Sequence, residues 1–233
     1  MFWSHHFAEV AKLAYSDNNK EGYNKLGYPG VEFYEDGGAQ GYVLWHDDYI
    51  TIAFRGTEPN EFNDIKADLK AFHHEGYHKG FFEEYMKLHH EIEAKVEELQ
   101  KVKPRPIYIT GHSLGGAMAT VCATFYPEAK ELYTYGSPRA LSWSKSKTLK
   151  VPHKRHVNNN DIVPKVPFAF IGFRHTGELC YINYYGNIRK MTTWQRIKDQ
   201  WRGRWRALKK GVPFDGMYDH SMNEYTRFLS DGE

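Results

Sequence analysis

The fold is decided by the stretch Ile107-Tyr108-Ile109-Thr110-Gly111-His112-Ser113-Leu114-Gly115. A β-rich run is followed by a Gly-x-Ser-x-Gly pentapeptide, and the small residues after it are typical of a helix that packs close to a sheet. This order predicts a sharp turn from strand to helix that holds the hydroxyl of Ser113 above the sheet. Bulky side chains beside the serine would clash in so tight a turn, which explains Gly111 and Gly115. The N-terminus of the helix would favour the negative charge that develops in acyl transfer.

On either side of this stretch, β-rich runs alternate with segments whose apolar residues recur at helical spacing. Asp47-Asp48 separates the first two runs and predicts a hairpin, whereas residues 22–41 are rich in Gly and Tyr and are predicted to form a loop. Alternating strands and helices indicate an α/β fold with a largely parallel sheet. No repeat or linker is present, so residues 1–233 are predicted to form a single domain. The expected strands span residues 42–45, 49–54, 107–110, 132–135, 154–158 and 178–183, and the expected helices span residues 7–15, 61–72, 81–100, 114–126, 193–209 and 220–229.

The composition excludes several classes of protein. Of the 233 residues, 41% are hydrophobic and 26% are charged, which argues against a disordered or fibrous chain. The sequence has no run of about 18 apolar residues that would form a transmembrane helix, and two cysteines are too few for a disulfide scaffold. The first residues lack the pattern of a signal peptide. A cytoplasmic protein, free or peripheral to a membrane, is therefore expected, and a secreted form stays open if a signal peptide had been removed.

The net charge of +2 conceals a segregation of charge along the chain. Residues 139–210 contain 17 Lys and Arg against 3 Asp and Glu, whereas the segments before and after them are acidic. A segment this basic would be expected to attract phosphates, lipid head groups or nucleic acid. The alternative is that its charges balance those of the acidic segments across the folded surface.

A serine hydroxyl becomes an effective nucleophile only beside a base, and the base needs an acid to orient it. Proteins with this elbow carry the three groups in the chain order serine, acid, histidine. Asp161 is the predicted acid, because it is the only acidic residue between Glu131 and Glu178 and it follows a predicted strand. Two histidines come after it. His220, at the start of the last predicted helix, is favoured as the base, and His175 is the alternative unless it is a structural histidine that bonds to the backbone.

The negative oxygen formed in acyl transfer needs two converging N–H donors. Leu114, directly after the serine, would supply one of them from its backbone. The second is predicted at Thr57, because Phe54-Arg55-Gly56-Thr57 ends a strand and its glycine lets the chain turn. The alternative for this stretch is an ordinary exit from a hairpin.

Several ordered motifs together resemble the class 3 lipases, the fungal-type lipase family of the α/β-hydrolase fold. The resemblance covers residues 7–229 and implies a mostly parallel central sheet with helices on both faces. It assigns nucleophile, acid and base to the positions of Ser113, Asp161 and His220, and the oxyanion donors to those of Thr57 and Leu114. The motifs that carry it are Phe54-Arg55-Gly56-Thr57, His78-Lys79-Gly80-Phe81, the serine elbow, Thr134-Tyr135-Gly136-Ser137-Pro138-Arg139, Asn160-Asp161-Ile162-Val163-Pro164 and Asp219-His220.

The resemblance implies a serine hydrolase of the lipase type that cleaves acylglycerols or related fatty-acyl esters through an acyl-enzyme, without a cofactor. A phospholipase A1 that acts on anionic phospholipids is the alternative within this class. An inactive module that binds membrane or nucleic acid is the alternative outside it, and the presence of all three triad residues argues against it. Residues 58–77 lie where the fungal enzymes carry their lid, and this segment is short with a modest helical pattern.

One helical segment carries a hypothesis of its own. Residues 193–210 contain seven Lys and Arg around an apolar stripe. Tryptophans on a basic helix are typical of a segment that lies on a membrane surface, so contact with an anionic membrane is one interpretation. The other is a helix whose tryptophans cover the sheet and whose basic residues are merely solvated. The stripe consists of Trp194, Ile197, Trp201, Trp205 and Leu208.

Two further patterns in the sequence are weaker. His73, His74 and His78 are close in sequence, but Gly76 interrupts any helix and no cysteines flank them, so no metal site is expected. Residues 163–173 are apolar and follow the predicted acid, so they either line an acyl pocket or belong to the core. No nucleotide-binding fingerprint is present, and no nucleic-acid partner is expected.

Overall fold

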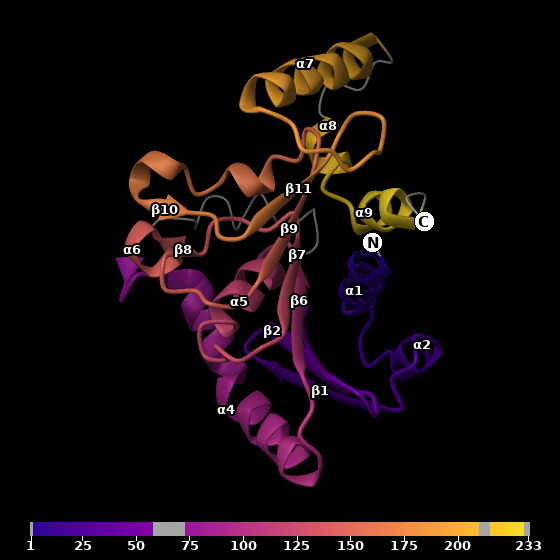
Figure 1. Ribbon diagram of the computed structural model, residues 1–233, viewed down its shortest axis with the longest axis vertical. Helices are drawn as coiled ribbons and strands as arrows, with labels where there is room; N and C mark the ends of the chain where they lie inside the picture. The colour runs from indigo at the N-terminus through magenta and orange to yellow at the C-terminus, as the bar shows by residue number, and fades with distance from the viewer. Residues whose placement is uncertain (1, 58–72, 210–214, 231–233) are drawn as a thin grey trace.

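The structure is a computed structural model, and it describes residues 2–57, 73–209 and 215–230 (Figure 1). The predicted helix at residues 61–72, and with it most of the segment that resembles a lid, lies outside the described residues. Within the described part of the chain, no helix combines the length and the hydropathy needed to cross a bilayer.

Seven of the described strands form the main sheet, and in the order in which they pair they are β1 (Gly30–Asp36), β2 (Ala39–Trp45), β3 (Ile50–Phe54), β6 (Ile107–His112), β7 (Glu131–Tyr135), β9 (His153–Asn158) and β11 (Glu178–Ile182). The strands β3, β6, β7, β9 and β11 run parallel, and β1 and β2 join them antiparallel at one side. The predicted α/β fold with a mostly parallel sheet is confirmed. Because parallel strands end at the same edge of a sheet, the segments that follow β3, β6, β7 and β9 meet there.

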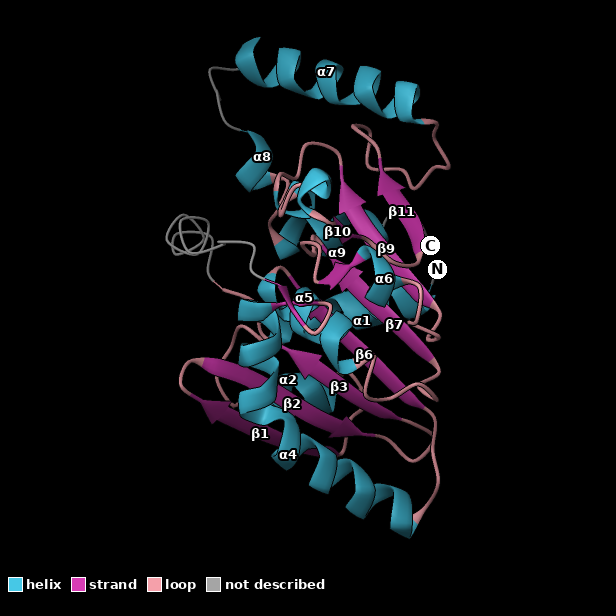
Figure 2. Cartoon of the chain, turned by 90° about the vertical axis from the view of Figure 1, so that its left-hand side faces the viewer, coloured by secondary structure: helices cyan, strands magenta, loops and turns pink. Residues whose placement is uncertain are grey.

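Helices cover both faces of this sheet (Figure 1). On one face α4 (Lys79–Val102) and α5 (Leu114–Cys122) bury their apolar residues in one core cluster, and on the other α1 (Phe2–Leu13) and α9 (Met222–Ser230) contribute to a second. Six apolar residues recur along α4 at helical spacing and are all buried, namely Phe81, Tyr85, Leu88, Ile92, Val96 and Leu99. Beyond β11, α7 (Thr193–Lys209) lies across the end of the molecule (Figure 2). The remaining helical segments are α2 (Lys20–Lys25), α6 (Trp143–Ser146), η1 (Val163–Lys165), η2 (Ala169–Ile171) and α8 (Asp215–Tyr218).

A second, smaller sheet joins segments that are distant in sequence. Its described strands pair in the order β10 (Phe173–Arg174), β8 (Leu141–Ser142), β5 (Tyr77–His78) and β4 (His73–His74). The imidazole of His78 stacks on Phe81, and that of His73 stacks on Phe173. These histidines therefore pack against aromatic rings in the structure.

The prediction of a loop over residues 22–41 is wrong. Most of this segment forms α2, β1 and the turn into β2. Gly37 and Gly38 both have positive φ, +51° and +86°, which is the backbone of a two-residue hairpin turn. Val31 and Phe33 pack against the core on the side of α1, so β1 forms because it buries alternate side chains. The predicted hairpin between residues 42–45 and 49–54 is confirmed, since Trp45 pairs with Ile50.

Candidate active site

Ser113 occupies a strained turn between β6 and α5. Its φ of 55° and ψ of −128° lie outside the regions that residues with a side chain normally adopt. A Cβ atom at Gly111 would collide with the backbone of Gly115, and one at Gly115 would collide with the carbonyl oxygen of Phe54. Both flanking glycines are thus required by close backbone contacts, and the predicted elbow is confirmed in its geometry.

The side chain of Ser113 is buried at the N-terminus of α5. Its backbone N–H donates to the carbonyl oxygen of Tyr135 on the neighbouring strand, 3.0 Å away, which holds the turn against β7. Its hydroxyl makes no hydrogen bond with the described residues. The hydroxyl therefore keeps its hydrogen-bonding capacity at a place where a helix dipole favours negative charge.

Asp161 and His220 are brought together from positions 59 residues apart. Asp161 follows β9, His220 precedes α9, and both side chains are almost fully buried. The imidazole Nδ1 lies 3.0 Å from Oδ1 and 2.9 Å from Oδ2 of the carboxylate. An ionised carboxylate only accepts hydrogen bonds, so Nδ1 carries the proton and donates it, which leaves Nε2 as the ring's acceptor. This is the tautomer that a general base needs.

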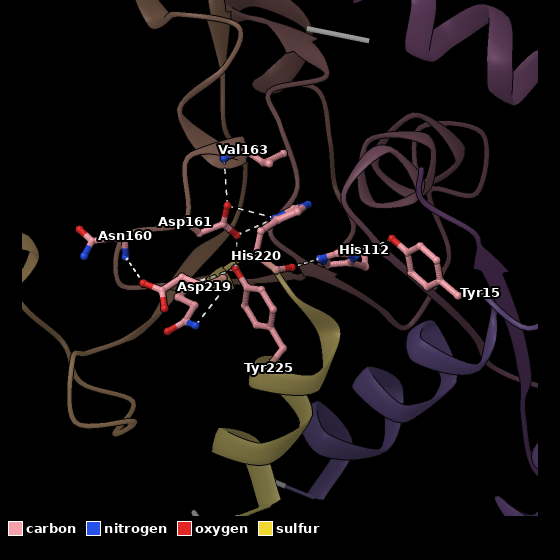
Figure 3. Close-up of polar contacts among 9 residues, drawn as sticks. Tyr15, His112, Asn160, Asp161, Val163, Asp219, His220 and Tyr225 are labelled. Carbon is pink, nitrogen blue, oxygen red and sulfur yellow. Dashed lines mark hydrogen bonds and ion pairs between the residues drawn. The ribbon is translucent and has the colours of Figure 1, made fainter. Parts of the chain in front are cut away.

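Besides His220, two groups donate hydrogen bonds to the carboxylate of Asp161 (Figure 3). The backbone N–H of Val163 reaches Oδ1 at 2.9 Å, and the hydroxyl of Tyr225 reaches Oδ2 at 2.6 Å. Burial, and after it the charge of Asp161, raises the pKa of Tyr225 well above its ordinary value, so this hydroxyl stays a donor. The site is therefore built for an acceptor-only group.

A second buried chain of hydrogen bonds links the elbow to His220 and was not expected from the sequence. His112 donates from Nε2 to the carbonyl oxygen of His220 at 2.7 Å, and its Nδ1 lies 2.6 Å from the hydroxyl of Tyr15 (Figure 3). Burial, and after it the neighbouring His220, lowers the pKa of His112 well below its ordinary value, so the ring is neutral. Its Nδ1 therefore accepts from Tyr15. The elbow residue next to Ser113 thus fixes the backbone of the predicted base.

Asp219 and Tyr225 position the loop that carries Asp161, and they too were missed. The backbone N–H of Asn160 donates to Asp219 Oδ2 at 3.0 Å, and the side chain of Asn158 donates to the carbonyl oxygen of Asp219 at 3.0 Å. The backbone N–H of Asn158 donates to the hydroxyl of Tyr225, also at 3.0 Å. The Asp219-His220 motif was the one sequence signal that pointed here. Nothing in the sequence singled out Tyr15 or Tyr225.

The end of β3 lies against the elbow. The close approach of Gly115 to the carbonyl oxygen of Phe54 places the residues after β3 beside the start of α5. A cavity of about 350 Å³ opens here, and both Thr57 and Leu114 line it. The two predicted oxyanion donors are therefore neighbours of one open space. The other described residues that line it are Asp17, Gly38, Ala39, Gln40, Arg55, Gly56 and Met118.

His175, the alternative base, has a different environment. Its Nε2 lies 2.7 Å from the carbonyl oxygen of Pro164. Burial, followed by the charges of Arg155 and Arg139, lowers its pKa well below the ordinary value, so it is neutral and donates to that carbonyl. The structure therefore favours the structural interpretation of His175 and pairs the predicted acid with His220.

Residues 51–171, more than half of the chain, match the family described as lipase (class 3). The chain belongs to the class 3 lipase family. A lipase of Rhizomucor miehei is 39% identical over 159 residues, which cover 61% of this chain and 41% of that protein. A secreted mono- and diacylglycerol lipase of Fusarium solani is 36% identical over 108 residues, which cover 43% of this chain and 32% of that protein. The chain thus spans less than half the length of either curated relative.

Solved structures of fungal lipases superimpose on this chain. Lipase II of Rhizopus niveus superimposes with a TM-score of 0.70 at 26% identity, over 78% of this chain and 80% of that one. The native propeptide complex of Rhizomucor miehei lipase also gives a TM-score of 0.70, at 25% identity over 78% and 68% of the two chains. The predicted α/β-hydrolase fold with helices on both faces of the sheet is confirmed.

In this member of the class 3 lipase family, Gly136 lies directly against the Asp161–His220 pair. Its φ is +56°, and a Cβ atom there would lie 2.7 Å from Asp161 Oδ2 and 2.7 Å from His220 Nδ1. Gly136→Ala is therefore expected to push the carboxylate and the imidazole apart and to lower kcat for a soluble ester by about 100-fold or more.

A matched control separates this collision from the cost of a side chain at positive φ. Gly27 has a φ of +92° and nothing within 4 Å of the added Cβ. Gly27→Ala bears a similar backbone cost of about 1–2 kcal/mol, and it is expected to change the melting temperature but not kcat. Equal kcat values for the two alanine variants would contradict the assignment of Gly136 as a contact of the pair.

Two further groups lie outside this site. His89, His90 and Glu93 on α4 present ligand atoms within 4.8 Å of one another, the one such group of three found among the described residues. The hydroxyl of Tyr85 already bonds to His89 Nδ1 at 2.9 Å.

Phe168 and Phe170, which follow the acid, are exposed and stack on each other, so the interpretation of these two residues as ordinary core is wrong.

Proposed function

We propose that this protein is a serine hydrolase that cleaves fatty-acyl esters of the acylglycerol type, with Ser113, Asp161 and His220 as its triad. The observation that carries the proposal is the buried Asp161–His220 pair, which His112 links to the glycine-flanked elbow that holds Ser113 at positive φ. Membership of the class 3 lipase family supports the same chemistry. The proposed reaction requires no cofactor.

In the proposed reaction each group has one role. The Oγ of Ser113 attacks the ester carbonyl carbon while Nε2 of His220 takes its proton, and Asp161 holds the Nδ1–H and stabilises the imidazolium. The bond to the alcohol then breaks as Nε2 returns the proton to the leaving oxygen, which forms the acyl-enzyme. A water molecule, deprotonated by the same nitrogen, attacks this ester, and the fatty acid leaves as Ser113 regains its proton.

The negative oxygen of each tetrahedral intermediate would receive the backbone N–H groups of Thr57 and Leu114. Both residues line one cavity, and Leu114 also lies at the N-terminus of α5, where the helix dipole adds to the two donors. The chain reaches this arrangement because Gly115 has no side chain to hold β3 away. Donors fixed before the reaction cost no reorganisation when charge develops.

Two features support a fatty-acyl substrate. The relatives described above are named lipase and mono- and diacylglycerol lipase. In addition, the stacked rings of Phe168 and Phe170 face solvent shortly after the acid, and Phe170 is 84% exposed. Exposed apolar rings on the segment that follows the acid would contact an acyl chain rather than a polar substrate.

The test is hydrolysis of p-nitrophenyl esters of increasing chain length, followed by dioleoylglycerol and phosphatidylglycerol as lipid substrates. Release of fatty acid from the glyceride supports the proposal. Release from phosphatidylglycerol without release from the glyceride would instead identify a phospholipase A1. If no ester is hydrolysed while the protein binds vesicles or nucleic acid, it is a binding module and the proposed activity is wrong.

The protein would also contact an anionic membrane through the tryptophans of α7. Trp194 is 67%, Trp201 67% and Trp205 62% exposed, so these rings do not pack on the sheet as an ordinary amphipathic helix would. The described charged groups that flank them, Lys198, Arg202, Arg204 and Lys209, are exposed as well. Indole rings with basic neighbours suit the surface of a bilayer that carries anionic lipids.

Flotation with vesicles of phosphatidylglycerol and phosphatidylcholine tests this contact. The double variant Trp201→Ala/Trp205→Ala is expected to lose at least tenfold in binding, because two indoles no longer enter the interface. Trp143→Ala is the matched control, since Trp143 is 56% exposed on α6 and is expected to leave binding unchanged. Binding that survives the double substitution removes the tryptophans from the contact.

The cytoplasmic location expected from the sequence stays a prediction. The Fusarium solani relative is named as a secreted lipase, which favours an extracellular place for part of the family rather than the cytoplasm. Fractionation of cells that express the natural gene would decide between the two compartments.

A further inference from the structure

The helix α7 packs with its polar face toward the protein. Trp194, Trp201 and Trp205 follow one another at spacings of seven and four residues, so they share one face of a helix with about 3.6 residues per turn. Asp199 and Gly203 lie on the opposite face, and both are buried. An amphipathic helix normally buries its apolar face, so α7 needs something specific to hold it the other way round.

Asp199 supplies that hold. Its side chain is 3% exposed, and its Oδ2 accepts three hydrogen bonds from the body of the protein. The donors are the backbone N–H of Tyr184 at 2.9 Å, the hydroxyl of Tyr181 at 3.1 Å and Nδ2 of Asn159 at 3.3 Å. A buried carboxylate is tolerated only when donors of this kind surround it. Asp199 is also the only acidic residue of α7, so the charges that the helix presents to solvent are basic.

Gly203, one turn further on, lets the helix approach closely. A Cβ atom at this position would lie 2.6 Å from Nδ2 of Asn160 and 3.2 Å from the side-chain amide of Asn159. Gln200, which lies between Asp199 and Gly203 in the chain, donates from Nε2 to the carbonyl oxygen of Asn159 at 3.1 Å. Glycine disfavours a helix by about 1 kcal/mol relative to alanine, so its presence here is explained by contact with the asparagines.

The asparagines that receive α7 belong to the loop of the predicted acid. Asn159 and Asn160 immediately precede Asp161 in the chain. On its other side the same loop is held by Asp219, the neighbour of His220, through the backbone N–H of Asn160. The same short loop is therefore bound on one side by α7, which exposes the tryptophans, and on the other by the segment that carries the base.

We infer that α7 is a lipid-docking platform built onto the loop of the acid, and that Asp199 is the positioning residue that couples the docked helix to Asp161. The inference rests on the proposed function, because it concerns how a lipid surface presents ester to that site. The occupant of the tryptophan face is an anionic bilayer surface. A nucleic-acid duplex would satisfy the basic side chains, but it offers no apolar layer for three indole rings.

The coupling makes binding and hydrolysis separable. Asp199→Leu removes the acceptor for all three donors, so α7 loses its attachment but keeps its tryptophans and its positive charge. The variant is expected to float with anionic vesicles nearly as well as the parent. Its hydrolysis of a fluorogenic acyl ester within those vesicles is expected to fall at least tenfold relative to its hydrolysis of soluble p-nitrophenyl butyrate.

The ratio of the two rates normalises any general loss of folded protein. Asp199→Asn keeps an acceptor oxygen and is expected to recover much of the ratio. Gly203→Ala, which displaces α7 without removing a buried charge, should lower the ratio in the same direction. Glu178→Leu is the matched control, a surface carboxylate paired with Lys190 away from this contact, and it should leave the ratio unchanged.

The outcomes separate this inference from the proposed function. A parent-like ratio in Asp199→Leu and Gly203→Ala would overturn the coupling, and binding to a DNA duplex without binding to anionic vesicles would overturn the lipid surface as occupant. Vesicle binding is measured on Ser113→Ala protein, so that hydrolysis does not change the vesicles. If Ser113→Ala hydrolyses both esters as fast as the parent, the proposed function fails, and the flotation result still decides whether α7 docks on lipid.

Discussion

Ser113→Ala is expected to lower the turnover of fatty-acyl p-nitrophenyl esters by roughly a millionfold, the scale at which removal of a triad nucleophile acts. In the proposed reaction, the hydroxyl of Ser113 is the group that forms the covalent bond to the acyl carbon. Alanine keeps the Cβ atom, so the strained backbone at φ 55° and its bond to the carbonyl oxygen of Tyr135 are retained. The loss would therefore be chemical rather than structural, and stopped assays with purified variants would measure it.

Ser137→Ala provides the matched control. Ser137 is also a buried serine close to the elbow, and its hydroxyl donates only to the carbonyl oxygen of Pro138, 3.1 Å away. Its removal is expected to change turnover by no more than about threefold, because one neutral hydrogen bond contributes about 1 kcal/mol to stability and nothing to the reaction. Comparable losses in both variants would mean that the nucleophile lies elsewhere.

Asp161→Asn is expected to lower kcat by about 10⁴-fold, as the loss of the orienting acid does in a serine triad. The carboxylate receives hydrogen bonds from Val163 and Tyr225 and from Nδ1 of His220. An amide has one acceptor oxygen and one NH₂ group. In either orientation its NH₂ group therefore faces at least one of these hydrogen-bond donors. His220 would then turn over or adopt the tautomer that leaves Nε2 protonated, and it could no longer accept the proton of Ser113.

Tyr225→Phe tests the same argument on a smaller scale. It removes one donor and leaves the carboxylate in place, so kcat is expected to fall only about tenfold, because one charge-assisted hydrogen bond contributes roughly 1.5–3 kcal/mol. Asp48→Asn, at an exposed turn between β2 and β3, controls for the amide substitution itself. A loss in Asp161→Asn no larger than in Tyr225→Phe would show that Asp161 does not orient the base.

The elbow could be predicted because its chemistry is local. A strand, two glycines and a serine constrain a few neighbouring peptide units, and the structure shows the expected sharp turn, with positive φ at Ser113, and the expected close contacts at Gly111 and Gly115. Chain order then left one acid and two histidines as candidates. The structure favours His220 over His175, since His220 contacts Asp161 and His175 contacts the backbone at Pro164.

The residues that hold this pair could not be predicted from the sequence. Tyr15 contacts His112 from 97 positions away in the chain, and Tyr225 contacts Asp161 from 64 positions away, so only the fold brings these partners together. Tyrosine is common in this chain, with 17 copies, so no local signal marks these two. The strand β1 was missed for a different reason, because the Gly37-Gly38 turn signal was not recognised.

The sequence by itself determined the elbow, the chain order of its three reactive groups and the extent of α7, because these depend on backbone geometry and on spacing within short segments. Only the tertiary structure decided which face of α7 meets the protein. The apolar stripe predicted burial as readily as exposure, and the choice depended on Asp199, whose three donors come from residues 15 to 40 positions away. A periodic pattern defines the two faces of a helix, but only contacts between distant segments can decide which of them is turned toward solvent.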